Sequence, residues 1–219
     1  MRISLDKIEE IRSDPEAYRQ AVEAGEKGFA RPGRHAIMQN ALQKWHRGEL
    51  TVEQARAEMI SKCQKRFEAK PGLSTVVRRF DQYVENYQVM ETETPLAPIR
   101  VSVQLPSGVD PRFRVTGTVR RLDRHSDGTY TAWLFEKTRA NWQGELRLPL
   151  ILNATAAKLN VNIEDLKIGV YCFSDDSAQT FSFTEAQVTN ARKELGALLV
   201  NLWSLVQEEP LPVQIAFDL

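Results

Sequence analysis

Residues 115–138, VTGTVRRLDRHSDGTYTAWLFEKT, contain the clearest structural signal in the chain. The first half, including FRVTGTVRRLDR over 113–124, alternates apolar and polar residues as a β-strand does. The second half, TYTAWLFEK over 129–137, is more apolar, as expected of a buried strand. Between them, HSDG offers the Asp-Gly pair typical of a tight turn. The segment therefore predicts a β-hairpin.

The sequence after residue 98 continues this sheet pattern. A further strand is expected at 99–105, IRVSVQL, followed by a Pro-Ser-Gly turn. GELRLPLILNATAAKLN predicts a helix over 144–160, despite its interior Pro149 and with its end near Asn160. Short strands are expected at 168–174 and 180–184, and the capping box Thr184-Glu185-Ala186-Gln187 predicts a long final helix.

The sequence before residue 90 favours helices. Ser4 can cap a first helix that Pro15 interrupts or restarts. A helical run follows Gly33, and Thr51-Val52-Glu53-Gln54 forms a second capping box. Apolar residues at three- and four-residue spacing predict one more helix, and they are Val76, Val77, Phe80, Tyr83 and Tyr87.

This order of elements predicts an α/β (α+β) fold with a mixed central β-sheet flanked by helices. At 219 residues the chain suits one domain, 1–219. Within it we expect an N-terminal helical part at 1–90, a sheet-containing core at 97–206 and a C-terminal tail at 207–219.

Composition excludes several classes of protein. Lys+Arg and Asp+Glu balance at 29 each, so any nucleic-acid-binding surface must be local. Two distant cysteines, Cys63 and Cys172, form neither a disulfide framework nor a zinc set. The charged N-terminal segment and the lack of a long apolar run predict a cytoplasmic protein without a membrane partner.

The chain resembles the RecB-type branch of the PD-(D/E)XK nuclease superfamily in four segments. They are SLDKIEEIRSDPEAY, GRHAIMQNAL with His35 at the family's histidine, the hairpin segment quoted above, and WQGELRLPLILNATAAKLN. The hairpin is the most specific match, because a glycine, a charged cluster, a DG turn and a terminal Lys-Thr recur in order. The resemblance implies a restriction-endonuclease-like core.

The resemblance also implies a metal site that this sequence lacks. Family members hold a divalent cation, usually Mg²⁺, between two carboxylates, often with a histidine, while a lysine orients the nucleophile. Here Arg120 stands at the first carboxylate position, and Leu134 or Phe135 at the second. His35 and Lys137, or Glu136, remain in register, and Arg147 replaces the usual glutamine of the following helix. We therefore expect no catalytic residues and no metal cofactor.

Two further points concern cofactors. The cysteine of the family's opening segment is Asp14 and no downstream cysteine trio exists, so we expect no iron–sulfur cluster. Asp123, Glu136, Glu145 or Glu93 could supply a relocated carboxylate, in which case Mg²⁺ would bind. Strand alternation places Asp123 on the face opposite Arg120, however, which argues against it.

A local basic strip accompanies the expected loss of the metal. The strip contains arginines and a lysine that could contact phosphates, and a tryptophan that could stack on a base. These residues are Arg112, Arg114, Arg120, Arg121, Lys137, Arg139, Trp142 and Arg147. Alternatively, the arginines pair with glutamates on a solvated face. Trp133 and Trp45 fit the core better, and His46 and His125 fit the surface.

Three functional hypotheses follow. The leading one is a catalytically inactive nuclease-like protein that binds nucleic acid, DNA more than RNA, or docks onto protein subunits of a nucleic-acid-processing or defence complex. The alternative is an active metal-dependent nuclease with a rearranged site. The third is a protein-interaction domain without nucleic-acid contact.

Overall fold

The computed structural model describes the chain apart from residues 1, 24–32, 68–71, 90–93, 97 and 208–219. The helices are α1 (Ile8–Ser13), α2 (Pro15–Glu23), α3 (Arg34–His46), α4 (Val52–Arg66), α5 (Leu73–Val89), α6 (Arg147–Leu159) and α7 (Glu185–Gln207). The strands are β1 (Arg2–Ser4), β2 (Thr94–Leu96), β3 (Ile99–Ser102), β4 (Arg114–Val119), β5 (Arg121–Arg124), β6 (Tyr130–Glu136), β7 (Leu166–Cys172) and β8 (Ser177–Phe181).

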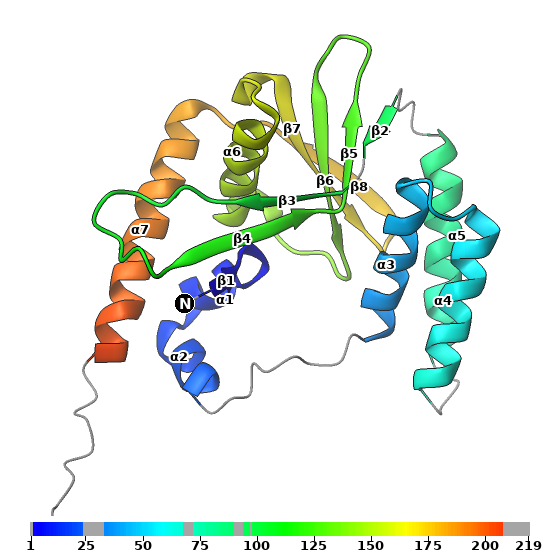
Figure 1. Cartoon of the computed structure of the whole chain (residues 1–219), viewed down its shortest axis with the longest axis horizontal. Coiled ribbons are helices and arrows are strands. Elements are labelled where there is room, and N and C mark those ends of the chain that lie inside the picture. The colour runs from blue at the N-terminus through cyan, green and yellow to red at the C-terminus, as the bar shows by residue number, and fades with distance from the viewer. Residues whose placement is uncertain (1, 24–32, 68–71, 90–93, 97, 208–219) are drawn as a thin grey trace, which may run out of the picture.

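The strands form two sheets, in which parallel and antiparallel pairs are mixed. The larger sheet has the order β2-β5-β6-β7-β8, and only its β6–β7 pair is parallel. The smaller sheet has the order β1-β4-β3, with β1 parallel to β4. In Figure 1, β3 and β4 run across the direction of β5 and β6. The mixed α+β fold is confirmed.

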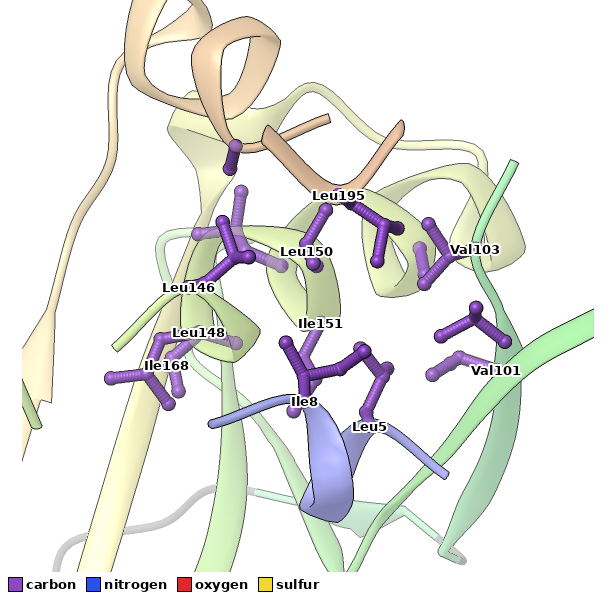
Figure 2. Packing of buried hydrophobic residues seen from close by; sticks show 14 of the residues in the cluster. Leu5, Ile8, Val101, Val103, Leu146, Leu148, Leu150, Ile151, Ile168 and Leu195 are labelled. Carbon is purple, nitrogen blue, oxygen red and sulfur yellow. The ribbon is translucent and has the colours of Figure 1, made fainter. Parts of the chain in front are cut away.

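Helices cover both faces of the larger sheet, and alternate side chains of β6 and β7 point to opposite layers. Trp133, Phe135 and Tyr171 pack among buried residues of α3, α4 and α5. Leu134 and Val170 pack instead among residues of α6 and α7. Figure 2 shows part of this second cluster, which also includes Val101 of β3 and Val103 just after that strand.

Local capping signals place the helix ends. Thr51 and Gln54 form both hydrogen bonds of the capping box that opens α4. At α7, the Thr184 backbone N–H donates to Gln187 Oε1 at 2.8 Å, and the Gln187 N–H donates to Thr184 Oγ1 at 3.3 Å. Asn160 ends α6 in the left-handed conformation with φ 56°. Pro149 is tolerated because it is the third residue of α6, where a backbone N–H would have no partner within the helix.

The structure corrects three expectations about the elements. Residues 2–4 form strand β1 by pairing with β4, and Ser4 then stands at the N-cap of the 3₁₀ turn Leu5–Lys7 that leads into α1, but its side chain makes no capping hydrogen bond. The predicted single strand 113–124 is divided at Arg120 into β4 and β5, which belong to different sheets. His46 is buried, with its Nε2 atom 2.8 Å from the Tyr83 hydroxyl, so the prediction of a surface position was wrong.

Two expectations concern residues outside those described, namely most of the tail at 207–219 and the carboxylate of Glu93. Among the described residues, no helix combines the length and the apolar character needed to cross a bilayer.

Candidate functional site

A cleft of about 260 Å³ lies where α3 and α6 meet the ends of β4 and β6. Its walls include the positions that the sequence singled out, and its lining residues are Asp6, His35, Gln39, Thr118, Arg120, Leu134, Phe135, Glu136, Lys137 and Arg147. These residues come from distant parts of the sequence. The fold therefore brings into one cleft all seven residues that the resemblance places at or beside the expected metal site, namely His35, Arg120, Leu134, Phe135, Glu136, Lys137 and Arg147.

Arg120 enters the cleft from the junction between β4 and β5. Its backbone N–H donates to the carbonyl oxygen of Trp133 at 2.9 Å, which fixes this junction against β6. Leu134 and Glu136 share one face of β6, and Leu134 packs in the cluster that includes α6. Phe135 packs in the opposite layer. Of the two positions left open by the sequence, Leu134 thus lies on the same side of β6 as Glu136.

His35 lies in the first turn of α3 and is held by a glutamine. The Gln39 Nε2 atom donates to the Phe135 carbonyl oxygen at 2.9 Å and lies 3.0 Å from His35 Nε2. Because an amide nitrogen only donates, His35 Nε2 must accept and the ring proton is on Nδ1. Burial, followed by the charges of Arg79, Lys137 and Arg120, lowers the pKa of His35 to about 4. The imidazole is therefore neutral near pH 7.

Arg120 and Lys137 supply the positive charge of the cleft that no carboxylate of the described residues pairs with. Lys137 is exposed and Arg120 is half-buried. Among the described residues, neither side chain has a carboxylate within ion-pair distance. Together they also depress the pKa of His35, which places both charges near that ring. The cleft thus has cationic groups whose hydrogen-bond donors are available to an anion.

Arg147 sits at the floor of the cleft in a ring of carboxylates. Its Nη1 atom lies 2.8 Å from Glu136 Oε1, and its Nε atom donates to Glu145 Oε2 at 2.6 Å. Asp6 Oδ1 lies further away, 3.9 Å from Nη1. The Arg147 side chain is only 9% exposed, and burial raises the pKa of Glu145 despite this pairing. The guanidinium therefore occupies a position where a bound cation would balance the same carboxylates.

The residues of the cleft do not fit the divalent metal that the family resemblance implies. The resemblance aligns Arg120, and either Leu134 or Phe135, with its two carboxylate positions, and none of these side chains is an oxygen ligand. Glu136 and Glu145 are already paired with Arg147. The Nε2 lone pair of His35 is taken by Gln39. In the described part of the chain, no three histidine, cysteine, aspartate or glutamate side chains are placed to hold a metal ion. Asp6 offers one exposed carboxylate at the cleft, and a single carboxylate is not the oxygen ligand set that a hard cation needs.

Three predicted nucleic-acid contacts are contradicted by burial. Arg121 is 1% exposed, donates to Asp123 Oδ1 at 2.6 Å and stacks over Tyr87. Trp142 is 2% exposed, so it cannot stack on a base. Arg147 is buried and neutralised as described above. Asp123 is fully buried on the Arg121 side of the strand, as the alternation argument predicted.

The remaining predicted contacts lie at the surface. Arg112 precedes β4, pairs with Asp110 at 2.7 Å and stacks over Trp203. Arg139 is exposed, with Asp175 at 3.4 Å. Arg114 is exposed on β4 and lies on the same face as Thr116 and Thr118.

The sequence reasoning missed two arginines of this surface, Arg2 on β1 and Arg100 on β3. Alternation in IRVSVQL could have found Arg100. Arg2 had no such signal, because its strand forms only by pairing with distant β4.

Comparison with known proteins identifies the fold and not the family. No protein-family model matches the chain, and no curated protein matches its sequence. The fold is similar to a crystal structure of a candidate exonuclease from Eubacterium rectale, with a TM-score of 0.58 and 8% identity over 96% of this chain and 83% of that one. The structure of SSO0001 aligns with a TM-score of 0.35 and 9% identity over 89% of this chain and 87% of that one, too low to bear on the fold. The chain therefore shares the fold of that candidate exonuclease.

Proposed function

We propose that this protein is a RecB-type nuclease-like protein that binds DNA in the cleft and does not cleave it. One observation carries the proposal: Arg120 and Leu134, which the resemblance aligns with metal-ligand positions, line one cleft with Arg147, and Arg147 pairs with the nearby carboxylates of Glu136 and Glu145. A cleft with this composition can attract a phosphate, but it cannot hold the cation that activates water.

The side chains suit phosphate chemistry. Arg120 presents planar, forked donors that match phosphate oxygens, and Lys137 adds a flexible point charge. Both are free of carboxylate partners in the described chain, so binding a phosphate breaks no existing ion pair. A permanent side-chain cation would then offset phosphate repulsion, as a metal does in active relatives.

Cleavage is tested first. Labelled single- and double-stranded DNA, and RNA, are incubated with the purified protein and either Mg²⁺ or Mn²⁺. We expect no products, and we expect EDTA to leave DNA binding unchanged because no bound metal supports it. Metal-dependent products that disappear in Glu136→Ala or His35→Ala would overturn the proposal in favour of an active nuclease with a rearranged site.

Binding is tested by fluorescence anisotropy over a range of salt. Arg120→Ala and Lys137→Ala should each weaken binding and lower the slope of log affinity against log salt by about one. Arg120→Asp should weaken it more, because it adds repulsion. Arg78→Ala is the matched control, since Arg78 is an exposed arginine on α5. Arg147→Ala is excluded from this series because Arg147 is buried and paired.

The proposal also includes a role within a larger assembly. Arg120→Ala would then weaken DNA binding in the native assembly as well as in the isolated chain, and co-purification would identify the partners. A wild-type chain that binds no oligonucleotide in either context, even at low salt, would leave a protein-interaction domain as the remaining hypothesis.

A further inference from the structure

The smaller sheet has one apolar face and one polar face, and the described residues cover only the apolar one. Ile3, Val101 and Val115 point into the core. The alternate residues of the same strands point outward, and they are Arg2, Ser4, Arg100, Ser102, Arg114, Thr116 and Thr118. Three arginines and four hydroxyl groups thus make up the outward face of the three strands, which we call the arginine face.

Within the part of the chain that the structure describes, no carboxylate balances the charges of the arginine face. Arg2 and Arg114 are register partners on neighbouring strands, where like charges repel. Within the described residues, no carboxylate lies at ion-pair distance from Arg2, Arg100 or Arg114. The rim carries Asp110, but Arg112 already pairs with that carboxylate at 2.7 Å. Adjacent arginines without a counterion weaken folding, so their charge points to an external anion.

The arginine face is hollowed and leads to the cleft. A groove of about 550 Å³ is lined by Arg2, Arg100 and Arg114 together with residues of the loop between β3 and β4. Along β4, Thr116 lines this groove and Thr118 lines the cleft, while Arg100 lies beside Thr118 in the register. Arg120 continues the same alternation. From Arg114 to Arg120 the row is about 20 Å long at strand spacing.

We propose that the arginine face binds the sugar-phosphate backbone of a DNA strand and guides it into the cleft. Guanidinium groups and hydroxyl groups are common donors to phosphate oxygens, and such contacts position a strand without reading its sequence. The described residues of this face include no exposed aromatic ring, so base stacking has no platform here. The inference rests on the proposed function, because it extends the DNA path from the cleft.

The experiment measures anisotropy of a fluorescein-labelled single strand of thymidines against salt. Arg100→Ala and Arg114→Ala should each lower the salt slope by about one, and the double variant by about two. Arg78→Ala on α5 should leave the slope unchanged. A duplex of the same length serves as a second arm. Tighter binding of the duplex than of the single strand, with both slopes lowered by the same variants, would overturn the assignment to one strand.

The two proposals fail in different ways. If the wild type binds and Arg120→Ala weakens binding while the double variant equals the wild type, the arginine face is not part of the path and the cleft proposal stands. If the wild type does not bind, the cleft proposal itself fails. The unfolding midpoint at low salt gives an independent readout, because Arg114→Ala removes repulsion and should not lower it. A midpoint that falls further below that of the wild type at low salt than at high salt would show that Arg114 is neutralised within the fold and would contradict the inference, because lost packing does not depend on salt.

Discussion

At the scale of single residues, neighbouring arginines have opposite environments. Arg120 faces the cleft, while Arg121 lies between Tyr87, Trp133 and the carboxylate of Asp123. Strand alternation predicts that the two point to opposite faces. It could not show that one of these faces is closed over by α5, because the helix reaches β5 only through tertiary packing. The basic strip expected from the sequence is therefore divided between surface and core.

The buried pair gives a stability prediction. Asp123→Ala leaves Arg121 charged in the core and also removes the acceptor of the Trp133 indole N–H. We expect a loss of roughly 3–5 kcal/mol in the free energy of unfolding, measured by urea denaturation. The matched control is Asp81→Ala, which breaks the exposed pair with Arg56 and should cost less than about 1 kcal/mol. Equal losses of unfolding free energy in Asp123→Ala and Asp81→Ala would contradict the prediction that breaking the buried pair costs more than breaking the exposed one.

The buried ring of His46 predicts a pH dependence. Burial, and then the charge of Arg121, lowers the pKa of His46 to about 3, whereas a histidine in the unfolded chain titrates near its ordinary pKa of 6.5. Between these values the unfolded chain binds more protons, so stability falls as the pH falls. From about pH 7 to about pH 4.5, the wild type should lose about 2 kcal/mol more than His46→Asn. Urea denaturation of both proteins at both pH values tests this, and parallel losses would contradict it.

At the scale of elements, the signals that were predicted correctly are local. The two capping boxes and the HSDG hairpin depend on residues within a few positions of each other, and all three form as expected. Strand β1 and the division at Arg120 were missed, because each is fixed by pairing with a distant strand. The cleft positions followed from the family resemblance, while the pairing of Arg147 with Glu136 required the three-dimensional structure.

One close approach between elements predicts an intolerant position. A Cβ atom added to Gly169 on β7 would lie 2.4 Å from Trp133 Cε3, in the layer between β6 and α5. Gly169→Ala should therefore destabilise the protein by roughly 1–3 kcal/mol, measured by urea denaturation. Gly144→Ala is the control, because a Cβ atom added there would meet nothing within 4 Å. If Gly169→Ala left the free energy of unfolding unchanged, the indole ring of Trp133 would have to be able to move aside.

At the scale of the whole molecule, the larger sheet joins two buried clusters. Strands β6 and β7 contribute alternate side chains to both, so the sheet couples the packing of the two clusters. The two layers in Figure 1 should therefore behave as one cooperative unit.

The free cysteines test this, because Cys63 lies in one cluster and Cys172 in the other. Pulsed thiol labelling along a urea gradient, read by mass spectrometry, should show both thiols becoming reactive with the same midpoint. Far-UV circular dichroism should give that midpoint too. Earlier labelling of Cys63 would show that the helical layer of α3, α4 and α5 opens separately.

The arginine at the floor of the cleft has an evolutionary consequence under the proposed function. A metal can dissociate and be replaced, but Arg147 is covalently part of the chain, and its single positive charge is shared by the carboxylates of Glu136 and Glu145. Replacing Leu134 alone by aspartate adds one carboxylate, but Arg147 still pairs with Glu136 and Glu145, so a metal would lack its other ligands. Replacing Arg147 alone leaves two carboxylates without their counterion. Under the proposed function, a metal site in this cleft would therefore require several coordinated substitutions, because Arg147, Glu136 and Glu145 depend on one another for charge balance.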